Sequence, residues 1–264
     1  MSWIFFRPTD SKVIETVLRA APLRRLYELG DLEEPHWPRT TWFAAERSMH
    51  IDALFMLYDA EPMPVLLAMD GNQEASGWLL KNVDEHITRR TYVHAEALLL
   101  RDFQELFPIT APVLYARMGL GKPACLESIA VPSGVETRSL TVNDLRELRT
   151  FYKAANEGHW FTDEMLSHGS YFGAYRNGVL KAVAGTHILS RSVGVAALGN
   201  IATLPENRSE GLATAVTGAL CQSLVPLIRT IGLNVRADNL AARRCYEKLG
   251  FEDISTFYEF YIER

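Results

Sequence analysis

The chain has 264 residues, of which 48% are hydrophobic and 22% charged, and its formal net charge at pH 7 is -5. This length and composition predict a folded protein with a sizeable core and two domains. The acidic balance gives no basic footprint for nucleic acid, and no stretch is apolar over a length sufficient to cross a membrane.

The cysteines and the N-terminal residues bear on the cellular compartment. The three cysteines, an odd number, lack the spacing of metal ligands; they are Cys125, Cys221 and Cys245. Free, buried thiols in a reducing compartment are therefore expected, and no metal site. The apolar run at 3–6 is too short for a signal peptide, so a cytoplasmic protein is the expectation.

The first half of the chain alternates helix and strand signals but carries no ligand-binding motif. Apolar periodicity predicts three helices, over 11–29 with an interruption near Pro22, over 44–58 and over 95–106. Apolar runs predict buried strands over 65–69 and 113–118. Neither a period of repetition nor a low-complexity tract is visible.

Glycine and proline residues gather at 119–135 and mark this stretch as the boundary between two domains. The predicted division is 1–125 and 126–264. A short strand is also possible at 126–131 within the boundary region.

The second half contains a clear succession of elements. A first strand leads to a helix over 142–155, capped near Thr141 or Asn143. Asn177-Gly178 between alternating apolar runs predicts a hairpin. A strand–helix–strand crossover, another helix and a last strand over 255–262 complete the order.

The crossover contains a turn suited to an anion. An apolar strand candidate ends near Leu204 and leads into Arg208-Ser209-Glu210-Gly211-Leu212-Ala213, where a long helix begins. Such a helix start leaves backbone N–H groups unpaired and aimed at one point, and the helix dipole adds to their attraction for a diphosphate. Gly211 and Ala213 allow close approach, and Arg208 can pair with a phosphate. Similar turns also open helices that bind nothing.

A second cluster follows about twenty residues later. The strand candidate over 231–235 leads into a helix over 240–249. Asn239 is a good N-cap for this helix, and Gly250 is suited to a left-handed C-cap.

These two clusters together resemble the GNAT superfamily of acyl-CoA-dependent N-acyltransferases. The resemblance rests on Arg208-x-x-Gly211-x-Ala213, Asn239-x-x-Ala242 and Tyr246-x-Lys248-Leu249-Gly250-Phe251, and covers 135–264. It implies an α/β fold of the α+β type, with a mixed, mostly antiparallel sheet flanked by helices. The turn departs from the commonest form at Ser209 and Glu210, and Glu210 brings a negative charge near the phosphates.

The resemblance leaves two interpretations of the first half open. It is either a degenerate tandem copy of the same fold or an unrelated α/β cap. In both cases this half is expected to shape the substrate cleft rather than to bind the cofactor.

The resemblance also implies the chemistry. The expected activity is transfer of an acetyl group from acetyl-CoA to a primary amine of a small molecule or peptide, by direct attack in a ternary complex. The strand ending at Thr203 is expected to splay from its neighbour and admit the pantetheine arm. The expected cofactor contacts are Ile201, Ala202, Thr203, Arg208, Ser209, Glu210, Gly211, Leu212, Ala213, Thr214, Asn234, Asn239, Ala242, Arg243 and Tyr246.

Candidate catalytic residues are Tyr246, Glu157 and His187. Tyr246 lies seven residues after Asn239 on the same helix face and is the candidate general acid, because a phenol stays protonated at neutral pH. The general base is less defined: Glu157, His159 and His187 all fall near the expected acceptor cleft, and a chain of waters is an alternative.

Two other function classes are alternatives to the acetyltransferase. One is a catalytically inactive CoA-binding or interaction module. The other is a nucleotide site, disfavoured because the turn lacks the glycine spacings of P-loops and dinucleotide folds. An amine acceptor is the expected partner, without nucleic acid or membrane, and a homodimer is left open.

Overall fold

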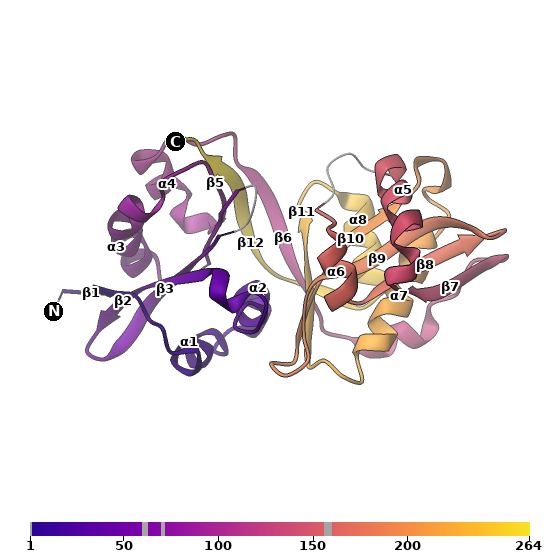
Figure 1. Cartoon of the computed structure of the whole chain (residues 1–264), viewed down its shortest axis with the longest axis horizontal. Helices are drawn as coiled ribbons and strands as arrows, with labels where there is room; N and C mark the ends of the chain where they lie inside the picture. Colours follow the sequence, from indigo (N-terminus) through magenta and orange to yellow (C-terminus); the bar gives the residue numbers. More distant parts are fainter. Residues whose placement is uncertain (1, 60–62, 70–71, 156–159) are drawn as a thin grey trace. The chain divides into compact units, whose positions relative to one another are not determined.

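The computed structural model, drawn in Figure 1, describes residues 2–59, 63–69, 72–155 and 160–264. The chain forms two compact units. The first unit comprises Met1–Arg117, Arg236–Asp238 and Ile254–Arg264, and the second comprises Met118–Val235 and Asn239–Asp253. The predicted fold class is confirmed, because both units combine helices with a mixed, mostly antiparallel sheet.

The first half of the chain contributes six strands and four α-helices among its described residues. In chain order these are β1 (Ile4–Phe6), α1 (Ser11–Leu18), α2 (Leu26–Gly30), β2 (Thr40–Arg47), β3 (His50–Tyr58), β4 (Val65–Ala68), α3 (Gln73–Val83), β5 (Thr91–Glu96), α4 (Leu100–Leu106) and β6 (Val113–Leu120). Strands β1 to β4 pair antiparallel in succession, and β4 pairs parallel with β5. A hydrophobic cluster joins α3 and α4 to one face of this sheet.

The second half repeats this order. Its elements are β7 (Val135–Leu140), α5 (Leu145–Ala155), α6 (Asp163–His168), β8 (Tyr171–Arg176), β9 (Val179–Ser190), β10 (Val195–Thr203), α7 (Leu212–Leu224), β11 (Thr230–Arg236), α8 (Leu240–Lys248) and β12 (Phe251–Ile262). Strands β7 to β10 again pair antiparallel in succession, and β10 pairs parallel with β11. The two halves are therefore copies of one topology, which favours the tandem interpretation of the first half.

Two predicted elements differ from the structure in type, and a third, the last strand, differs in its pairing. The helix expected over 44–58 is wrong: β2 and β3 form a hairpin there, and its tip is Ser48 and Met49 with φ of 53° and 62°. Helix-forming residues fill this stretch, but pairing with neighbouring strands overrides their local preference. The possible strand at 126–131 is instead a 3-10 helix over Pro123–Ser128.

The last strand is present, but most of it belongs to the first unit. It was expected to complete the second domain, yet β12 pairs antiparallel with β5, from Phe257↔Glu96 to Ile262↔Thr91. The first unit therefore contains Ile254–Arg264, and the compact units are not contiguous in sequence. A pairing between residues more than 150 positions apart leaves no local signal. No helix among the described residues is long and apolar enough to span a membrane.

Candidate functional site

Strands β10 and β11 separate where the resemblance places the pantetheine arm. Their parallel pairing runs from Val195↔Thr230 to Leu198↔Leu233. Both strands continue beyond it, β10 to Thr203 and β11 to Arg236. Ile201, Ala202 and Thr203 are half-buried, and Ala202 and Thr203 pair on their other side with β9. Asn234 is the first residue of β11 past the paired segment.

A β-bulge in β10 accompanies this separation. The register with β9 shifts between Gly199 and Ala202, and Asn200 within the shift has a left-handed φ of 52°. A bulge bends its strand and increases the local twist, and here it begins at Gly199, directly after Leu198, the last residue of β10 that pairs with β11. Sequence reasoning missed Asn200. The available signal was Gly-Asn inside an apolar strand, since asparagine tolerates this conformation better than most residues.

Two buried tyrosines hold the bulge. The Tyr152 hydroxyl of α5 donates to the Asn200 carbonyl at 2.6 Å, and the Asn200 side-chain nitrogen donates to the Tyr171 hydroxyl at 3.0 Å. Tyr171 in turn donates to the Thr186 carbonyl at 3.2 Å. Phe161 stacks on Tyr152 with ring centroids 5.0 Å apart. These aromatic residues therefore fix the shape of the gap, whereas Trp160 is exposed.

The turn between β10 and α7 has the geometry of an anion site. Gly211 is the N-cap residue of α7, with φ of 79°, and no side chain caps the helix. Ala215 N donates to the carbonyl of this N-cap residue at 3.0 Å, so the N–H groups of Leu212, Ala213 and Thr214 lie ahead of the helical hydrogen bonds. Ser209 is also left-handed, with φ of 65°.

The two charged side chains of the turn differ in their hydrogen bonds and ion pairs. Arg208 is exposed, and its guanidinium makes a long contact with α5, 3.5 Å from Nη2 to the Ala155 carbonyl. Glu210 is ion-paired with Arg176 at the end of β8, and its other oxygen lies 3.4 Å from Asn207 Nδ2. The hydrogen bond from Arg176 is the main cause that lowers the pKa of Glu210, so this carboxylate is ionised and its charge is balanced.

Helix α8 lies against the first turn of α7. The Thr214 hydroxyl contacts Cys245 Sγ at 3.2 Å. Asn239 caps α8 as predicted, accepting from Ala242 N at 3.1 Å, so its side chain is already engaged. Arg243 is paired with Asp253 at 2.7 Å. This pair competes with any contact from Arg243 to a phosphate.

Tyr246 is buried in the second unit, 7% exposed. Its ring packs edge-on against Phe251, with centroids 6.1 Å apart. Burial, followed by the neighbouring thiols of Cys245 and Cys221, raises the pKa of Tyr246 above its ordinary value. The phenol therefore stays protonated throughout the physiological range.

The candidate bases fall in two places. Glu157 and His159 lie outside the residues that the structure describes. His187 lies on β9 with its ring over Gly199, since a Cβ built there would be 2.4 Å from ring atoms. His187 is thus adjacent to the bulge. In the part of the chain that the structure describes, no group of three His, Cys, Asp or Glu residues could hold a metal.

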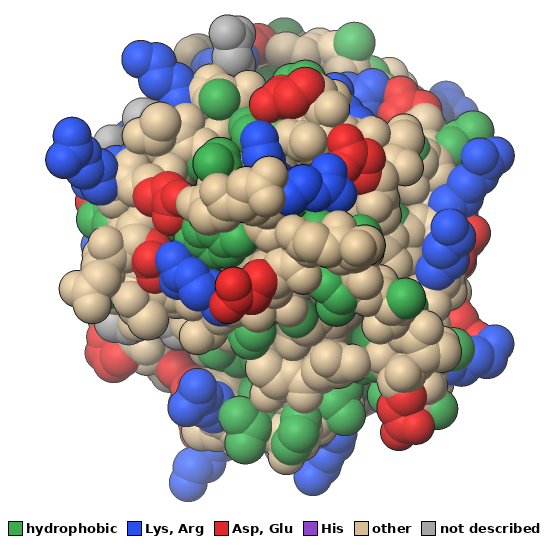
Figure 2. Space-filling view, turned by 90° about the vertical axis from the view of Figure 1, so that its right-hand side faces the viewer, with side chains coloured by type: hydrophobic (Ala, Val, Ile, Leu, Met, Phe, Trp, Pro, Cys, Tyr) green, Lys and Arg blue, Asp and Glu red, His purple; other side chains and the backbone are tan. Residues whose placement is uncertain are grey.

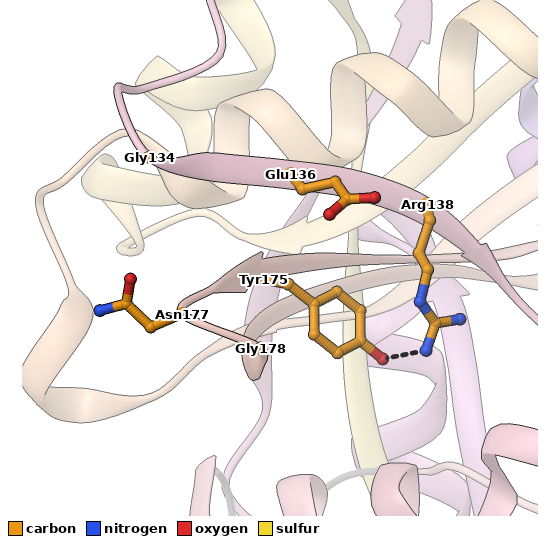
Figure 3. Close-up of a pocket in the computed structure, with 6 residues that line it drawn as sticks. All are labelled: Gly134, Glu136, Arg138, Tyr175, Asn177 and Gly178. Atoms are coloured by element: carbon orange, nitrogen blue, oxygen red, sulfur yellow. Dashed lines mark hydrogen bonds between the residues drawn. The ribbon is translucent and has the colours of Figure 1, made fainter.

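A surface pocket of the second unit is separate from these residues. It is a cavity of about 340 Å³ at the β7–β8 edge, lined by Gly134, Glu136, Arg138, Tyr175, Asn177 and Gly178 (Figure 3). Of the predicted site residues that the structure describes, none lines it. Acidic and basic side chains are interspersed on the face shown in Figure 2, without a patch of one sign.

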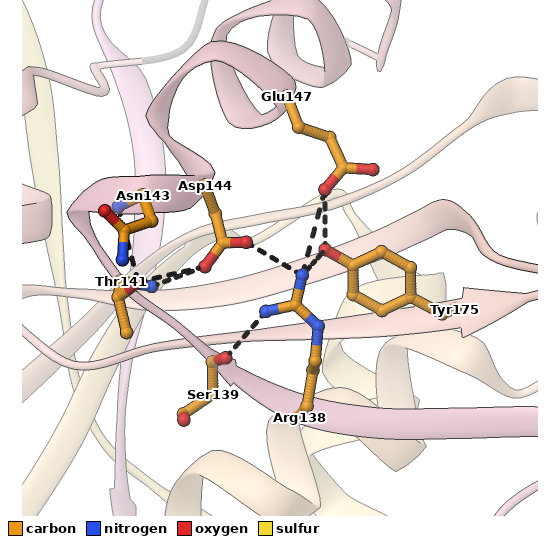
Figure 4. Close-up of polar contacts among 7 residues, drawn as sticks. All are labelled: Arg138, Ser139, Thr141, Asn143, Asp144, Glu147 and Tyr175. Carbon is orange, nitrogen blue, oxygen red and sulfur yellow. Dashed lines mark hydrogen bonds and ion pairs between the residues drawn. The ribbon is translucent and has the colours of Figure 1, made fainter.

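The arginine of this pocket, Arg138, is hydrogen-bonded to neighbouring protein groups (Figure 4). Arg138 donates to Asp144 Oδ1 at 2.8 Å, to the Tyr175 hydroxyl at 2.7 Å and to the Ser139 carbonyl at 3.0 Å. Asp144 also forms a capping box with Thr141, which confirms the predicted cap ahead of α5. The guanidinium is therefore occupied by the protein and holds the start of α5 on the sheet.

The first unit contains a buried polar layer that sequence reasoning missed. Tyr92, His94 and Glu96 alternate along β5 with Val93 and Ala95, which belong to the hydrophobic cluster, so the polar side chains face the other way. His94 Nε2 lies 3.4 Å from Glu259 Oε1, and Arg117 Nη1 lies 3.7 Å from Glu96 Oε1. The alternation in this strand was the usable signal.

We expect this layer to make stability fall at acid pH through His94. Burial, followed by the charge of Arg117, lowers the pKa of His94 from 6.5 to about 3. Below pH 6.5 His94 binds a proton in the unfolded chain, whereas in the folded chain it stays neutral until the pH approaches 3. Stability is thus complete above pH 6.5 and decreases by about 2 kcal/mol between pH 7 and pH 5.

Urea unfolding of the parent and of His94→Gln at pH 7 and pH 5 measures this effect. Between pH 7 and pH 5 the free energy of unfolding of the variant should decrease by about 2 kcal/mol less than that of the parent. Asp31 and Glu96, whose pKa values are raised mainly by burial, act in the opposite direction but are common to both proteins. An equal decrease in both proteins would contradict the assignment to His94.

Comparison with known proteins bears on the fold of the chain. Residues 171–260, from β8 into β12, match the FR47-like protein family. No curated protein sequence matches the chain. Among solved structures, a Drosophila protein is 14% identical over 98% of both chains with a TM-score of 0.74. A GCN5-related N-acetyltransferase from Sphaerobacter thermophilus is 15% identical over 99% of this chain and 95% of its own, with a TM-score of 0.68.

The tandem arrangement also has a solved counterpart. A tandem GNAT protein from the clavulanic acid biosynthesis pathway is 13% identical over 98% of both chains, with a TM-score of 0.60. At these identities the similarity concerns the fold. The chain thus has the GNAT fold in a two-domain arrangement, with an FR47-like region in its C-terminal half.

Proposed function

We propose that this chain with the GNAT fold is an N-acetyltransferase that transfers an acetyl group from acetyl-CoA to a primary amine of a small molecule or peptide. The observation that carries the proposal is the uncapped start of α7 at Gly211, next to the separation of β10 and β11. An open helix start attracts a diphosphate, and unpaired strand edges can bond a pantetheine amide. A capped helix beside fully paired strands would offer neither.

In the proposed reaction the amine nitrogen attacks the thioester carbonyl carbon, so that a C–N bond forms and the C–S bond breaks. Backbone groups of Ile201, Ala202 and Thr203 position the thioester and stabilise the developing oxyanion. The nitrogen releases its proton to a base, Glu157 or His187, directly or through water. Tyr246 gives its proton to the departing sulfur.

The coenzyme should stabilise the folded protein. At a concentration 100 times its Kd a ligand adds about 2.7 kcal/mol, which is a rise in melting temperature of about 5 to 10 °C for a chain of this size. Thermal unfolding with acetyl-CoA, ATP and NAD at equal millimolar concentration tests this. A rise with ATP or NAD but not with acetyl-CoA would reject the proposal.

We expect one coenzyme per chain, despite the repeated topology. In the first unit the corresponding helix α3 is capped by its own Asn72, whose side chain accepts from Ala75 N at 3.2 Å. That contact occupies an N–H group that an anion would need. Isothermal titration with CoA should therefore give a stoichiometry near one, and a value near two would assign a second site to the first unit.

The alternative is a catalytically inactive module that binds CoA. It shares the binding site and differs in turnover. Thiol release from acetyl-CoA, measured across a panel of small-molecule and peptide amines, separates the two functions. Coenzyme binding without release on any amine would favour the module.

A further inference from the structure

The pair between Arg176 and Glu210 lies at the coenzyme turn and has no role in the chemistry described above. Glu210 directly precedes Gly211, the N-cap of α7, so its backbone is within about 4 Å of the helix start. The two side chains are 30% and 34% exposed, so solvent and ligands reach them. Arg176 comes from the end of β8, on another part of the second unit's sheet.

A carboxylate at this position opposes the proposed ligand. Unpaired, the Glu210 charge would repel a diphosphate arriving at the N–H groups that follow it. Arg176 cancels that charge, and Asn207 holds the second oxygen from within the turn. Lys181 of β9 adds a further positive charge nearby, and its carbonyl accepts from Leu204 N at 3.0 Å.

We propose that Arg176 is a positioning residue for the diphosphate turn, acting through Glu210. It neutralises the carboxylate and anchors the turn to the end of β8, and it makes no direct contact with the phosphates. The pair compensates for the acidic residue that this chain has in the turn. This inference rests on the proposed function, because it assumes that CoA binds there.

A double-mutant cycle with Arg176→Ala and Glu210→Gln tests the proposal. In the parent background, Arg176→Ala should raise the KM for acetyl-CoA and the Kd for CoA by about 5- to 10-fold, with kcat within twofold. In the Glu210→Gln background the same change should alter both constants less than about twofold, because no charge remains to neutralise. Arg176→Lys should recover part of the loss.

Arg149→Ala is the matched control. Arg149 of α5 forms an exposed ion pair with Asp163 of α6, 3.0 Å from Nε to Oδ1, and neither residue belongs to the turn or to its ion pair, so its loss should leave KM and Kd unchanged. Equal losses from Arg176→Ala in both backgrounds would mean direct phosphate contact and would overturn the proposal. So would no loss in either.

The parent protein distinguishes failure of this inference from failure of the proposed function. If CoA neither stabilises nor titrates the parent, the coenzyme site itself is wrong and the inference falls with it. If CoA binds the parent and Arg176→Ala binds it equally well, only the role of Arg176 is wrong.

Discussion

We expect Gly211→Trp to weaken coenzyme binding strongly and to leave the second unit folded. Gly211 begins α7 with φ of 79°, and an indole there would cover the N–H groups of the following residues. Losing two hydrogen bonds to a charged group weakens binding by about 100-fold or more. Among the described residues, the one atom within 4 Å of a Cβ placed at Gly211 is Pro132 Cγ, at 3.6 Å, which leaves space for the base of a side chain. Isothermal titration with CoA measures the loss.

Gly178→Trp is the control for backbone strain. Gly178 also has a positive φ, 73°, and a Cβ there would have no atom of the described residues within 4 Å. Both variants should lose about 1 to 2 kcal/mol of stability from the left-handed backbone, but only Gly211→Trp should lose CoA. Coenzyme affinity that survives in Gly211→Trp would move the site to another part of the chain.

The features that sequence predicted well are those encoded by neighbouring residues. The Asn177-Gly178 hairpin between β8 and β9 is confirmed, with both residues at positive φ. Asn239 caps α8, and Gly250 ends it with φ of 91°. In each case the residue type satisfies a backbone requirement within a few positions of itself, so the pattern alone is informative.

The features that sequence could not predict depend on distant partners. The β2–β3 hairpin turns at Ser48-Met49, which lacks the usual asparagine and glycine, and its strands contain helix-forming residues. The tandem repeat is visible in strand pairing but not in sequence. Its last strand, β12, pairs with β5 across more than 150 positions.

The candidate site divides in the same way. Its turn and its two helix starts were predicted from local patterns. Asn200 depends on Tyr152 and Tyr171, which are 48 and 29 positions away, and Glu210 depends on Arg176, which is 34 positions away. Such contacts follow from the folded sheet and from no spacing in the chain. The assignments of catalytic and cofactor residues remain predictions.

Tyr246→Phe should lower kcat by about 100-fold while the Kd for CoA stays within about threefold. The change removes one hydroxyl and keeps the ring against Phe251, so packing in the buried position is retained. If the phenol protonates the leaving thiolate, its loss removes a contribution of about 100-fold or more. Steady-state thiol release and CoA titration measure the two constants separately.

Tyr175→Phe supplies the matched control, because it removes the same atom from a tyrosine of the same unit. The Tyr175 hydroxyl donates to Glu147 at 2.7 Å and accepts from Arg138, so its loss should cost about 1 kcal/mol of stability and leave kcat unchanged. Because burial raises the pKa of Tyr246, the parent should show no loss of kcat from its ionisation up to pH 10. A Tyr246→Phe enzyme with the parent's kcat would remove Tyr246 from the mechanism and leave water as the source of the proton.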